Sequence, residues 1–226
     1  MFFPTEKSGR PMSRLLRRGA FIAFEGIDGS GKTTQVRRFA QKLRERQIPV
    51  RTTAEPTTGP IGAMIRQSFS GRTEFDDRVI AALFVADRLD HLTNKFDGVF
   101  KLVNDGQTVV TDRYYLSSYA YHASEVDIDW IAAANSINTN IIRPDLTIFI
   151  DIEPAVALQR ITENRLIADR FEVLPRLEAA RENYFHAFDL VKGTENIVIV
   201  SGEQGEDELA DIIWKEAEAT MESFNW

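Results

Sequence analysis

Residues 20–35 read Ala-Phe-Ile-Ala-Phe-Glu-Gly-Ile-Asp-Gly-Ser-Gly-Lys-Thr-Thr-Gln. The apolar stretch at 20–25 predicts a strand, and residues 33–46 predict a helix. Between them, residues 26–33 match the pattern G-x-x-x-x-G-K-[ST], which is meaningful when a strand precedes it and a helix follows. The unit therefore predicts an α/β fold that binds phosphate groups at the start of its first helix.

The glycine-rich turn carries the groups that a nucleoside triphosphate needs. Gly26, Gly29 and Gly31 let the backbone wrap closely and turn its N–H groups toward an anion. Lys32 is placed to reach the β- and γ-phosphates, and the Thr33 hydroxyl to ligate Mg²⁺. GTPases, motors and kinases share this pattern, so it predicts the ligand and the metal but not the reaction.

Short β-rich runs alternate with longer helical patterns along the rest of the chain, which is typical of α/β proteins. We expect strands at residues 20–25, 50–54, 108–112, 146–151 and 197–201, and helices at 33–46, 61–68, 78–96, 129–138, 154–162, 177–191 and 206–224. The nearly continuous apolar runs suit parallel strands covered on both faces. The predicted fold is the P-loop NTPase fold, an open parallel five-stranded sheet with helices on both faces and a short lid.

The composition limits the other possibilities. The 226 residues suit one domain, and the net charge of −7 argues against nucleic-acid binding through a broad basic surface. The chain has no cysteine, which excludes disulfides, and its apolar runs are too short to span a bilayer. We expect a cytoplasmic protein that binds neither nucleic acid nor membrane. Residues 1–19 are rich in Lys and Arg and predict a flexible basic extension, which leaves 20–226 as the domain.

Residues 109–114, Val-Val-Thr-Asp-Arg-Tyr, place two charged groups at the carboxyl end of a predicted strand. Asp112 can hold Mg²⁺ or orient a cation there, and Arg113 can clamp a phosphate group with two hydrogen bonds. A strand-terminal ion pair explains the same two residues without any ligand.

Phe84 and Arg88 lie four residues apart in a predicted helix and therefore share one of its faces. An aromatic ring beside a guanidinium suits a nucleobase, which can stack on the ring and accept hydrogen bonds at its edge. The alternative, a core phenylalanine beside a surface arginine, is the commoner meaning of such a pair taken alone.

The stretch from residue 160 to 172 holds Arg160, Arg165 and Arg170. Arginines on a flap between two helices suit the lid of a phosphoryl-transfer enzyme, which stabilises transition-state charge and excludes water. A charged, solvated loop would show the same composition. We expect a short lid near residues 160–172.

Together these segments resemble the thymidylate kinases, over nearly all of residues 20–226. The similar segments are the turn at 26–33 with its aspartate at 28, Asp-Arg-Tyr at 112–114, Ser-Ser-Tyr-Ala-Tyr at 117–121, Arg-Pro-Asp-Leu at 143–146 and Asp-Arg-Phe-Glu at 169–172. The resemblance implies a nucleoside-monophosphate kinase that transfers the γ-phosphoryl group of ATP to dTMP, giving dTDP for dTTP synthesis. It also implies Mg²⁺ as cofactor and a homodimer.

The resemblance implies roles for individual residues as well. The base is expected to stack on Phe84, with Arg88 at its edge, and the deoxyribose to lie against Tyr121. The ATP-binding set is Gly26, Asp28, Gly29, Ser30, Gly31, Lys32, Thr33, Thr34 and Arg160. The dTMP-binding set is Asp28, Phe84, Arg88, Arg113, Ser118, Tyr121 and Arg66. The catalytic set is Lys32, Arg113, Arg165 and Asp28, and Thr33 and Asp112 are expected to hold the metal.

Some positions differ from the family pattern. Ala54 stands where an arginine frequently binds the acceptor phosphate, so this task falls to Arg66 or Arg113. His122 stands where glutamine is frequent, and Gly29 where some members carry an arginine. Because the turn lacks this arginine, we expect the catalytic arginine to come from the lid, and we favour Arg165.

Other functions remain open at this point. The chain could phosphorylate another nucleotide or a small metabolite. It could also be a P-loop protein that binds a nucleotide as a regulator without catalysis. An inactive relative is disfavoured because Lys32, Thr33, Arg113 and the lid arginines are all present.

Overall fold

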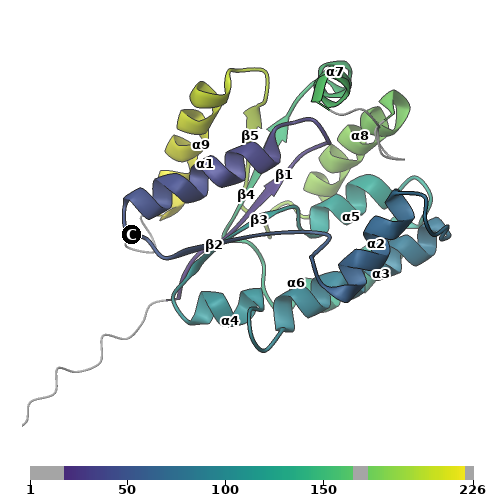
Figure 1. The fold of residues 1–226 in the computed structure, drawn as a ribbon, viewed down its shortest axis with the longest axis horizontal. Helices are drawn as coiled ribbons and strands as arrows, with labels where there is room; N and C mark the ends of the chain where they lie inside the picture. The colour runs from purple at the N-terminus through teal and green to yellow at the C-terminus, as the bar shows by residue number, and fades with distance from the viewer. Residues whose placement is uncertain (1–17, 165–172, 222–226) are drawn as a thin grey trace, which may run out of the picture.

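The computed structural model describes residues 18–164 and 173–221 (Figure 1). Its strands are β1 (Phe21–Glu25), β2 (Val50–Ala54), β3 (Thr108–Asp112), β4 (Leu146–Asp151) and β5 (Ile197–Ser201). Its helices are α1 (Lys32–Glu45), α2 (Pro60–Phe69), α3 (Asp77–Thr93), α4 (Val99–Asn104), α5 (Tyr115–His122), α6 (Ile128–Thr139), α7 (Pro154–Asn164), α8 (Leu174–Leu190) and α9 (Glu206–Met221).

The strands form one parallel sheet in the order β2-β3-β1-β4-β5. Phe24 of β1 pairs with Asp112 of β3, which in turn pairs with Ala54 of β2, so the carboxyl ends of these strands meet at one edge. The expected α/β fold and its five parallel strands are confirmed. Four strands have the predicted bounds, and β1 begins one residue later than predicted.

The helices cover both faces of the sheet (Figure 1). Alternate residues of β1 point to opposite faces, as the period of a strand requires. Ile22 and Phe24 pack with α1 and α9, whereas Phe21 and Ala23 pack with helices α3 to α8. Sheet and helices therefore enclose two hydrophobic layers, and the glycine-rich turn after β1 emerges between them at the carboxyl edge.

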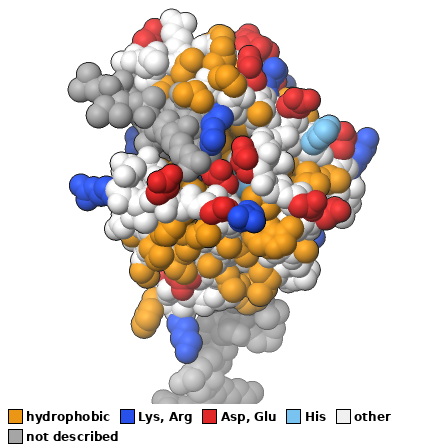
Figure 2. Space-filling model, turned by 90° about the vertical axis from the view of Figure 1, so that its right-hand side faces the viewer, with side chains coloured by type: hydrophobic (Ala, Val, Ile, Leu, Met, Phe, Trp, Pro, Cys, Tyr) orange, Lys and Arg blue, Asp and Glu red, His pale blue; other side chains and the backbone are white. Residues whose placement is uncertain are grey.

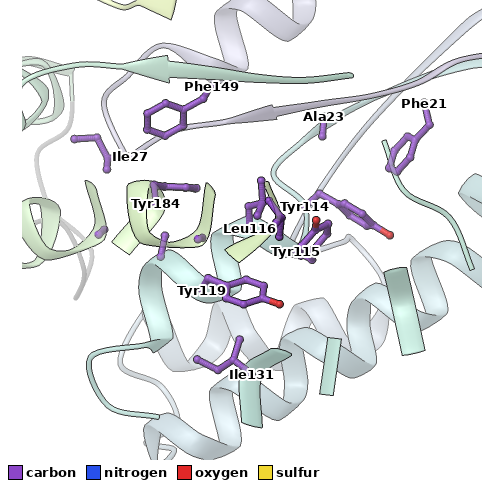
Figure 3. Close-up of a cluster of buried hydrophobic side chains, with 14 of the residues drawn as sticks. Phe21, Ala23, Ile27, Tyr114, Tyr115, Leu116, Tyr119, Ile131, Phe149 and Tyr184 are labelled. Atoms are coloured by element: carbon purple, nitrogen blue, oxygen red, sulfur yellow. The ribbon is translucent and has the colours of Figure 1, made fainter. Parts of the chain in front are cut away.

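The second of these layers is rich in aromatic rings (Figure 3). Phe149 of β4 lies 4.8 Å from Tyr184 of α8, and Phe21 lies 5.1 Å from Tyr114, measured between ring centroids. Such tilted and edge-to-face pairs add to the burial of large apolar area. They anchor α5 and α8 beneath the carboxyl edge, where the charged residues gather.

Helices α4 and α5 were not expected from the sequence. Helix α5 has the sequence Tyr-Leu-Ser-Ser-Tyr-Ala-Tyr-His, whose aromatic and serine residues are weak helix formers. All of its residues except Tyr121 are buried, so tertiary packing against α8 stabilises it. The expectation that every strand is covered on both faces is wrong for β2 and β5, because both are edge strands with exposed residues.

The predicted basic extension at 1–19 and the predicted lid at 160–172 each lie only partly within the described residues. Arg18 pairs with Asp145 at 2.7 Å, and the N–H of Gly19 donates to Val103, so residues 18 and 19 contact the domain. Residues 1–17 lie outside the described residues. Helix α7 continues to Asn164, which places Arg160 on a helix, and residues 165–172 also lie outside the described residues.

The surface and the helices bear on possible partners. Figure 2 shows one face on which acidic and basic side chains are interspersed between hydrophobic areas, so this face carries both signs of charge. Within residues 18–164 and 173–221, no helix combines the length and apolar character that crossing a bilayer requires.

Candidate functional site

The glycine-rich turn joins β1 to α1 and leaves the start of that helix open. Gly29 and Gly31 have φ angles of 81° and 92°, in the left-handed region that favours glycine. A Cβ atom at Gly29 would lie 2.4 Å from the carbonyl oxygen of Ala157. No side chain caps the N-terminus of α1, so its first N–H groups remain available to an anion. The turn is thus shaped to bind phosphate.

A cavity of about 600 Å³ lies over this turn. It is lined by residues 28–35 of the turn and of α1, by Ala54, Glu55, Asp112 and Arg113 from neighbouring strand ends, by Arg160 and Ile161 of α7, and by the loop before α9. The turn, Arg113 and Arg160 therefore share one cavity, as expected for groups that act on the same phosphates.

Lys32 is buried at the base of this cavity, with 5% of its surface exposed. Its Nζ donates to the carbonyl oxygen of Ile27 at 2.8 Å. Burial lowers the pKa of Lys32 to about 8, and the charge of Arg113 contributes further. Burial and the nearby Arg113 both disfavour the charged form of Lys32. A phosphate bound in the cavity would add an opposite charge and so favour the ammonium.

Thr33 and Asp112 face each other at the carboxyl edge, where the hydroxyl donates to the carboxylate at 2.5 Å. A hydroxyl and a carboxylate oxygen are the hard ligands that Mg²⁺ prefers. Among the described residues, no group of three or more His, Cys, Asp or Glu could hold a metal. These two residues fit an ion that completes its shell with phosphate oxygens and water, as Mg²⁺ does in phosphate sites.

Arg113 is the centre of a buried charged cluster. Its φ of 74° is unusual for a residue with a side chain, and its N–H donates to Phe24. Its Nη2 contacts Asp28 at 2.5 Å and the Tyr121 hydroxyl at 3.2 Å. Tyr121 donates to the second oxygen of Asp28 at 2.9 Å. The structure thus brings together three residues that lie up to 93 positions apart in the sequence.

Asp28 is held as an anion by this cluster. Burial raises the pKa of its carboxyl, but the charges of Arg113 and Lys32 and the Tyr121 hydroxyl outweigh burial, and the pKa falls to about 2. Arg113 also keeps its charge, and its Nη1 donates to Ser117 at 3.0 Å. An anionic Asp28 therefore holds the Arg113 guanidinium beside the cavity of the turn.

Arg88 is the centre of a second buried cluster, and the surface-arginine alternative is wrong because this side chain is 0% exposed. Its Nε and Nη2 lie 2.8 and 2.7 Å from Glu55. Its Nη1 donates to Ser118 and Asn135 at 3.0 and 2.5 Å, and its Nη2 donates to the carbonyl of Tyr114 at 3.2 Å. All three nitrogens have protein acceptors, which joins α3, α5 and α6 at one point.

Phe84 lies one helical turn from Arg88 on α3 and is partly exposed. Its ring centroid lies 6.1 Å from that of Phe69 on α2 and 5.3 Å from that of His122 on α5. Ser118 and His122 are four residues apart on α5 and share a helix face. Phe84, Ser118 and His122 therefore surround one region beside Arg88.

The remaining predicted residues lie apart from these clusters. Arg66 is exposed on α2, and its guanidinium donates to the carbonyl oxygens of Pro56 and Thr57. Within the described part of the chain, Arg66 is not among the residues that line the cavity over the turn. Arg165 and Arg170 lie outside the described residues, so the structure does not place them.

Comparison with known proteins identifies the family. Residues 24–213 match the family model described as thymidylate kinase. A thymidylate kinase from Acholeplasma laidlawii is 35% identical over 200 residues, which cover 85% of this chain and 96% of the relative. Probable thymidylate kinases from Methanosphaera stadtmanae and Pyrobaculum aerophilum are 37% and 38% identical, over 85% and 73% of this chain and 94% and 81% of each relative. The chain belongs to the thymidylate kinase family.

One sequence feature runs against this assignment to the thymidylate kinase family. Residues 94–97 read Asn-Lys-Phe-Asp, which has the pattern Asn-Lys-x-Asp that GTPases use to read guanine. Here Asn94 directly follows α3 and accepts a hydrogen bond from the N–H of Phe96, within a turn that leads to α4. Asn94 and Asp97 line a cavity of about 570 Å³ that shares Thr33, Ala54 and Asp112 with the cavity over the turn, but Lys32 does not line it. The tetrapeptide is therefore a helix-terminal turn.

Sequence reasoning predicted Asp28 but missed two further buried carboxylates of these clusters, Glu55 beside Arg88 and Glu25 beneath the segment that follows Arg113. Glu25, which ends the apolar run of β1, is fully buried and accepts hydrogen bonds from the backbone N–H of Tyr114 and Ser117. It also accepts from the hydroxyls of Ser117 and Tyr184 at 2.6 and 2.8 Å. Burial raises the pKa of Glu25 by more than these hydrogen bonds lower it, so the pKa lies above its usual value. The sequence did offer a signal for this role, since Glu25 is a charged residue at the end of a strand that is otherwise apolar.

Proposed function

We propose that this chain transfers the γ-phosphoryl group of ATP to dTMP, giving ADP and dTDP for dTTP synthesis. The observation that carries this proposal is the shared cavity in which the open phosphate loop faces Arg113. One anion can bind to the loop while a second binds to the guanidinium. A site with two such positions suits transfer between two nucleotides better than hydrolysis or simple binding. The relatives named thymidylate kinase support dTMP as the acceptor.

The donor half of the site would bind ATP. Arg160 lines the cavity on the side of α7, where it can contact the donor nucleotide. Thr33 and Asp112 would hold Mg²⁺, which neutralises charge on the transferred group when it is bound. The proposed ATP-binding residues are Gly26, Asp28, Gly29, Ser30, Gly31, Lys32, Thr33, Thr34 and Arg160.

The acceptor half of the site would bind dTMP. We propose that the base stacks on Phe84 and that Arg113 binds its phosphate, with Asp28 and Tyr121 on the sugar side. The Ser118 hydroxyl accepts from Arg88 and has no acceptor of its own among the described residues. We propose that it donates this proton to the edge of the base. A direct bond from Arg88 to the base would require it to exchange one of its protein acceptors. Arg66 would need a new rotamer to reach the phosphate, so Arg113 carries most of that task.

Catalysis would follow from position and charge rather than from covalent chemistry. Lys32 and Arg113 stabilise negative charge on the transferred group, and Asp28 fixes the direction of Arg113. We propose that Arg165, on a lid spanning residues 160–172, supplies a further positive charge in the transition state. Residues 20–226 would form this kinase domain, preceded by a basic extension at 1–19.

We also propose a cytoplasmic homodimer. Neighbouring helices α3 and α6 expose apolar residues at helical spacing, and a contiguous exposed apolar face commonly marks an interface. These residues are Val79, Ala82 and Ala86 of α3 with Trp130, Ala133 and Ile137 of α6. Such a face suits a two-fold contact between two copies. Sedimentation of the purified chain tests it, because Trp130→Glu with Ile137→Glu should convert a dimer to a monomer.

The direct test of the proposed activity is identification of the product. The purified chain is mixed with ATP, MgCl₂ and dTMP, and the products are separated by ion-exchange chromatography. We expect dTDP and ADP in equal amounts, with neither formed by Lys32→Ala. Binding of both nucleotides without turnover would favour a regulator. Turnover with another monophosphate but not with dTMP would favour a different kinase.

A further inference from the structure

His91 lies in the last turn of α3 and joins that helix to the end of strand β2. The residue is buried, with 9% of its surface exposed. Its Nε2 lies 2.7 Å from the Thr53 hydroxyl, and its Nδ1 lies 3.0 Å from Oε1 of Glu55. Both ring nitrogens therefore have a partner, and one of these partners is the carboxylate that binds Arg88.

The pairing of this carboxylate with Arg88 is uneven. The Nε and Nη2 atoms of Arg88 lie 2.8 and 2.7 Å from the same oxygen of Glu55, Oε2. In the usual bidentate pair of an arginine and a carboxylate, two nitrogens bond two different oxygens. Within residues 18–164 and 173–221, the recorded donor to the other oxygen, Oε1, is His91. His91 thus occupies the oxygen that a bidentate pair would offer to Arg88.

The charge of Glu55 decides which atom donates. Burial raises the pKa of this carboxyl, but the charge of Arg88 and the hydrogen bond with His91 outweigh burial, and the pKa lies below its usual value. An ionised carboxylate only accepts hydrogen bonds, so Nδ1 of His91 is the donor. The Glu55 side chain is 1% exposed and that of Arg88 is 0% exposed, so water is a poor substitute for a lost donor.

The direction of the carboxylate affects the direction of the guanidinium, because the two planar groups are in close contact. Without a donor at Oε1, the carboxylate could rotate until both of its oxygens bind Arg88. The guanidinium would then turn as well. Its Nη1 would leave its present acceptors, Ser118 at 3.0 Å and Asn135 at 2.5 Å. A change at His91 would in this way reach α5 and α6.

We propose that His91 is a positioning residue for the acceptor half of the site, which holds the Glu55 carboxylate so that Arg88 keeps its present direction. His91 itself faces elsewhere, since it lines the cavity of about 570 Å³ beside β2. The effect on dTMP rests on the proposed function. The link from His91 through Glu55 to Arg88 needs no ligand and can be tested without one.

Substitutions at His91 separate the bond to Glu55 from the volume of the ring. Asparagine can place an amide N–H near the position of Nδ1, whereas leucine has a size similar to histidine and no donor. We expect His91→Leu to raise the KM for dTMP about tenfold, the effect of one displaced buried hydrogen bond. The KM for ATP and kcat should stay within about twofold of wild type, and His91→Asn should keep the KM for dTMP within about threefold.

Two further variants serve as controls. Thr53→Val removes the bond at Nε2 of His91 and keeps the bond at Nδ1, so the KM for dTMP should stay within about threefold of wild type. His186→Leu, at an exposed histidine of α8, should change neither KM. A merely structural role of His91 would raise the KM values for dTMP and ATP together in His91→Leu.

Nuclear magnetic resonance tests the link in the absence of nucleotides. The Nε–H group of Arg88 is buried and bonded to Glu55, which protects it from exchange with water. Its ¹⁵N signal is assigned through correlations along its own side chain. We expect this signal to shift in His91→Leu and to stay near its wild-type position in His91→Asn and Thr53→Val.

The two experiments distinguish the failure of this inference from the failure of the proposed function. If wild-type protein neither binds nor phosphorylates dTMP, the proposed function fails and the role of His91 in acceptor binding fails with it. If dTMP reacts but the Arg88 signal is the same in His91→Leu as in wild type, only the inference is overturned. A KM for dTMP that is unchanged in His91→Leu, or equally raised in His91→Leu and His91→Asn, also overturns it.

Discussion

The phosphate half and the proposed base half of this site are built in different ways. The phosphate half is one continuous turn, residues 26–33, whose backbone provides most of the binding groups. The base half is assembled from α3, α5, α6 and the residue after β2, all joined through Arg88. A local turn can be recognised in a sequence, whereas an assembly of four segments depends on the fold. The reaction class is thus easier to read from the sequence than the acceptor.

Lys32→Ala is the strongest test of the phosphate half. We expect kcat to fall by about 10³-fold or more, because a buried charge aimed at the transferred group acts where water is largely excluded. The circular dichroism spectrum and Tm should stay near wild type, since the turn loses only the bond from Lys32 to the Ile27 carbonyl and keeps its backbone bond from Ser30 to Ile27. Steady-state kinetics at saturating ATP and dTMP give the result. More than a few per cent of the wild-type kcat would show that Lys32 has another role.

Arg160, Arg165 and Arg170 test whether the phosphate half needs the proposed lid. Arg165→Ala should lower kcat on the order of 10³-fold and raise the KM values far less, because a charge supplied in the transition state affects the rate more than binding. Arg160→Ala and Arg170→Ala should have smaller effects on kcat. The three variants are compared in one coupled assay of ADP release. Near-normal kcat in all three would mean that Arg113 and Lys32 suffice.

The same contrast explains how much of the molecule could be predicted from its sequence. The five strands and the turn follow from local patterns, so they were predicted almost to the residue. Helix α5 was not, because its aromatic residues favour a helix only when packed against α8. The partners of Arg88 could not be predicted either. Glu55 and Asn135 lie 33 and 47 residues from it, and only the folded chain brings them together.

Glu25→Gln tests the support of Arg113 from the core. The carboxylate accepts from the N–H groups of Tyr114 and Ser117, which directly follow Arg113, and an amide would turn donors toward the Ser117 and Tyr184 hydroxyls. We expect the KM for dTMP to rise about tenfold, from displacement of Arg113, with the KM for ATP nearly unchanged. Tyr184→Phe, which removes one of these bonds, should show a smaller effect in the same direction. An equal rise in both KM values would indicate general loosening of the fold.

The pH dependence of ADP binding tests the charge of Lys32 in the free protein. Its pKa of about 8 means that the side chain is charged at neutral pH and loses its proton as the pH rises through that value. If the charged form is the one that binds, the Kd for MgADP should rise about tenfold between pH 7 and pH 9. Titration calorimetry measures it, and Lys32→Ala is the control whose Kd should not show this change. A constant Kd in wild-type protein would contradict the assignment.

The most direct test of the central claim is kcat/KM for dTMP, dUMP, dCMP and UMP at fixed ATP. We expect dTMP to be best and dUMP to lag several-fold, because the 5-methyl group adds about 0.8 kcal/mol of apolar burial. The Ser118 hydroxyl accepts from Arg88 and would point its own proton toward the amino group of cytosine, so dCMP should lose about ten- to a hundredfold. UMP should fall below dUMP, since the proposed contact between Tyr121 and the sugar would leave little room for a 2′-hydroxyl. A higher kcat/KM for dCMP, AMP or GMP than for dTMP would contradict thymidylate as the acceptor.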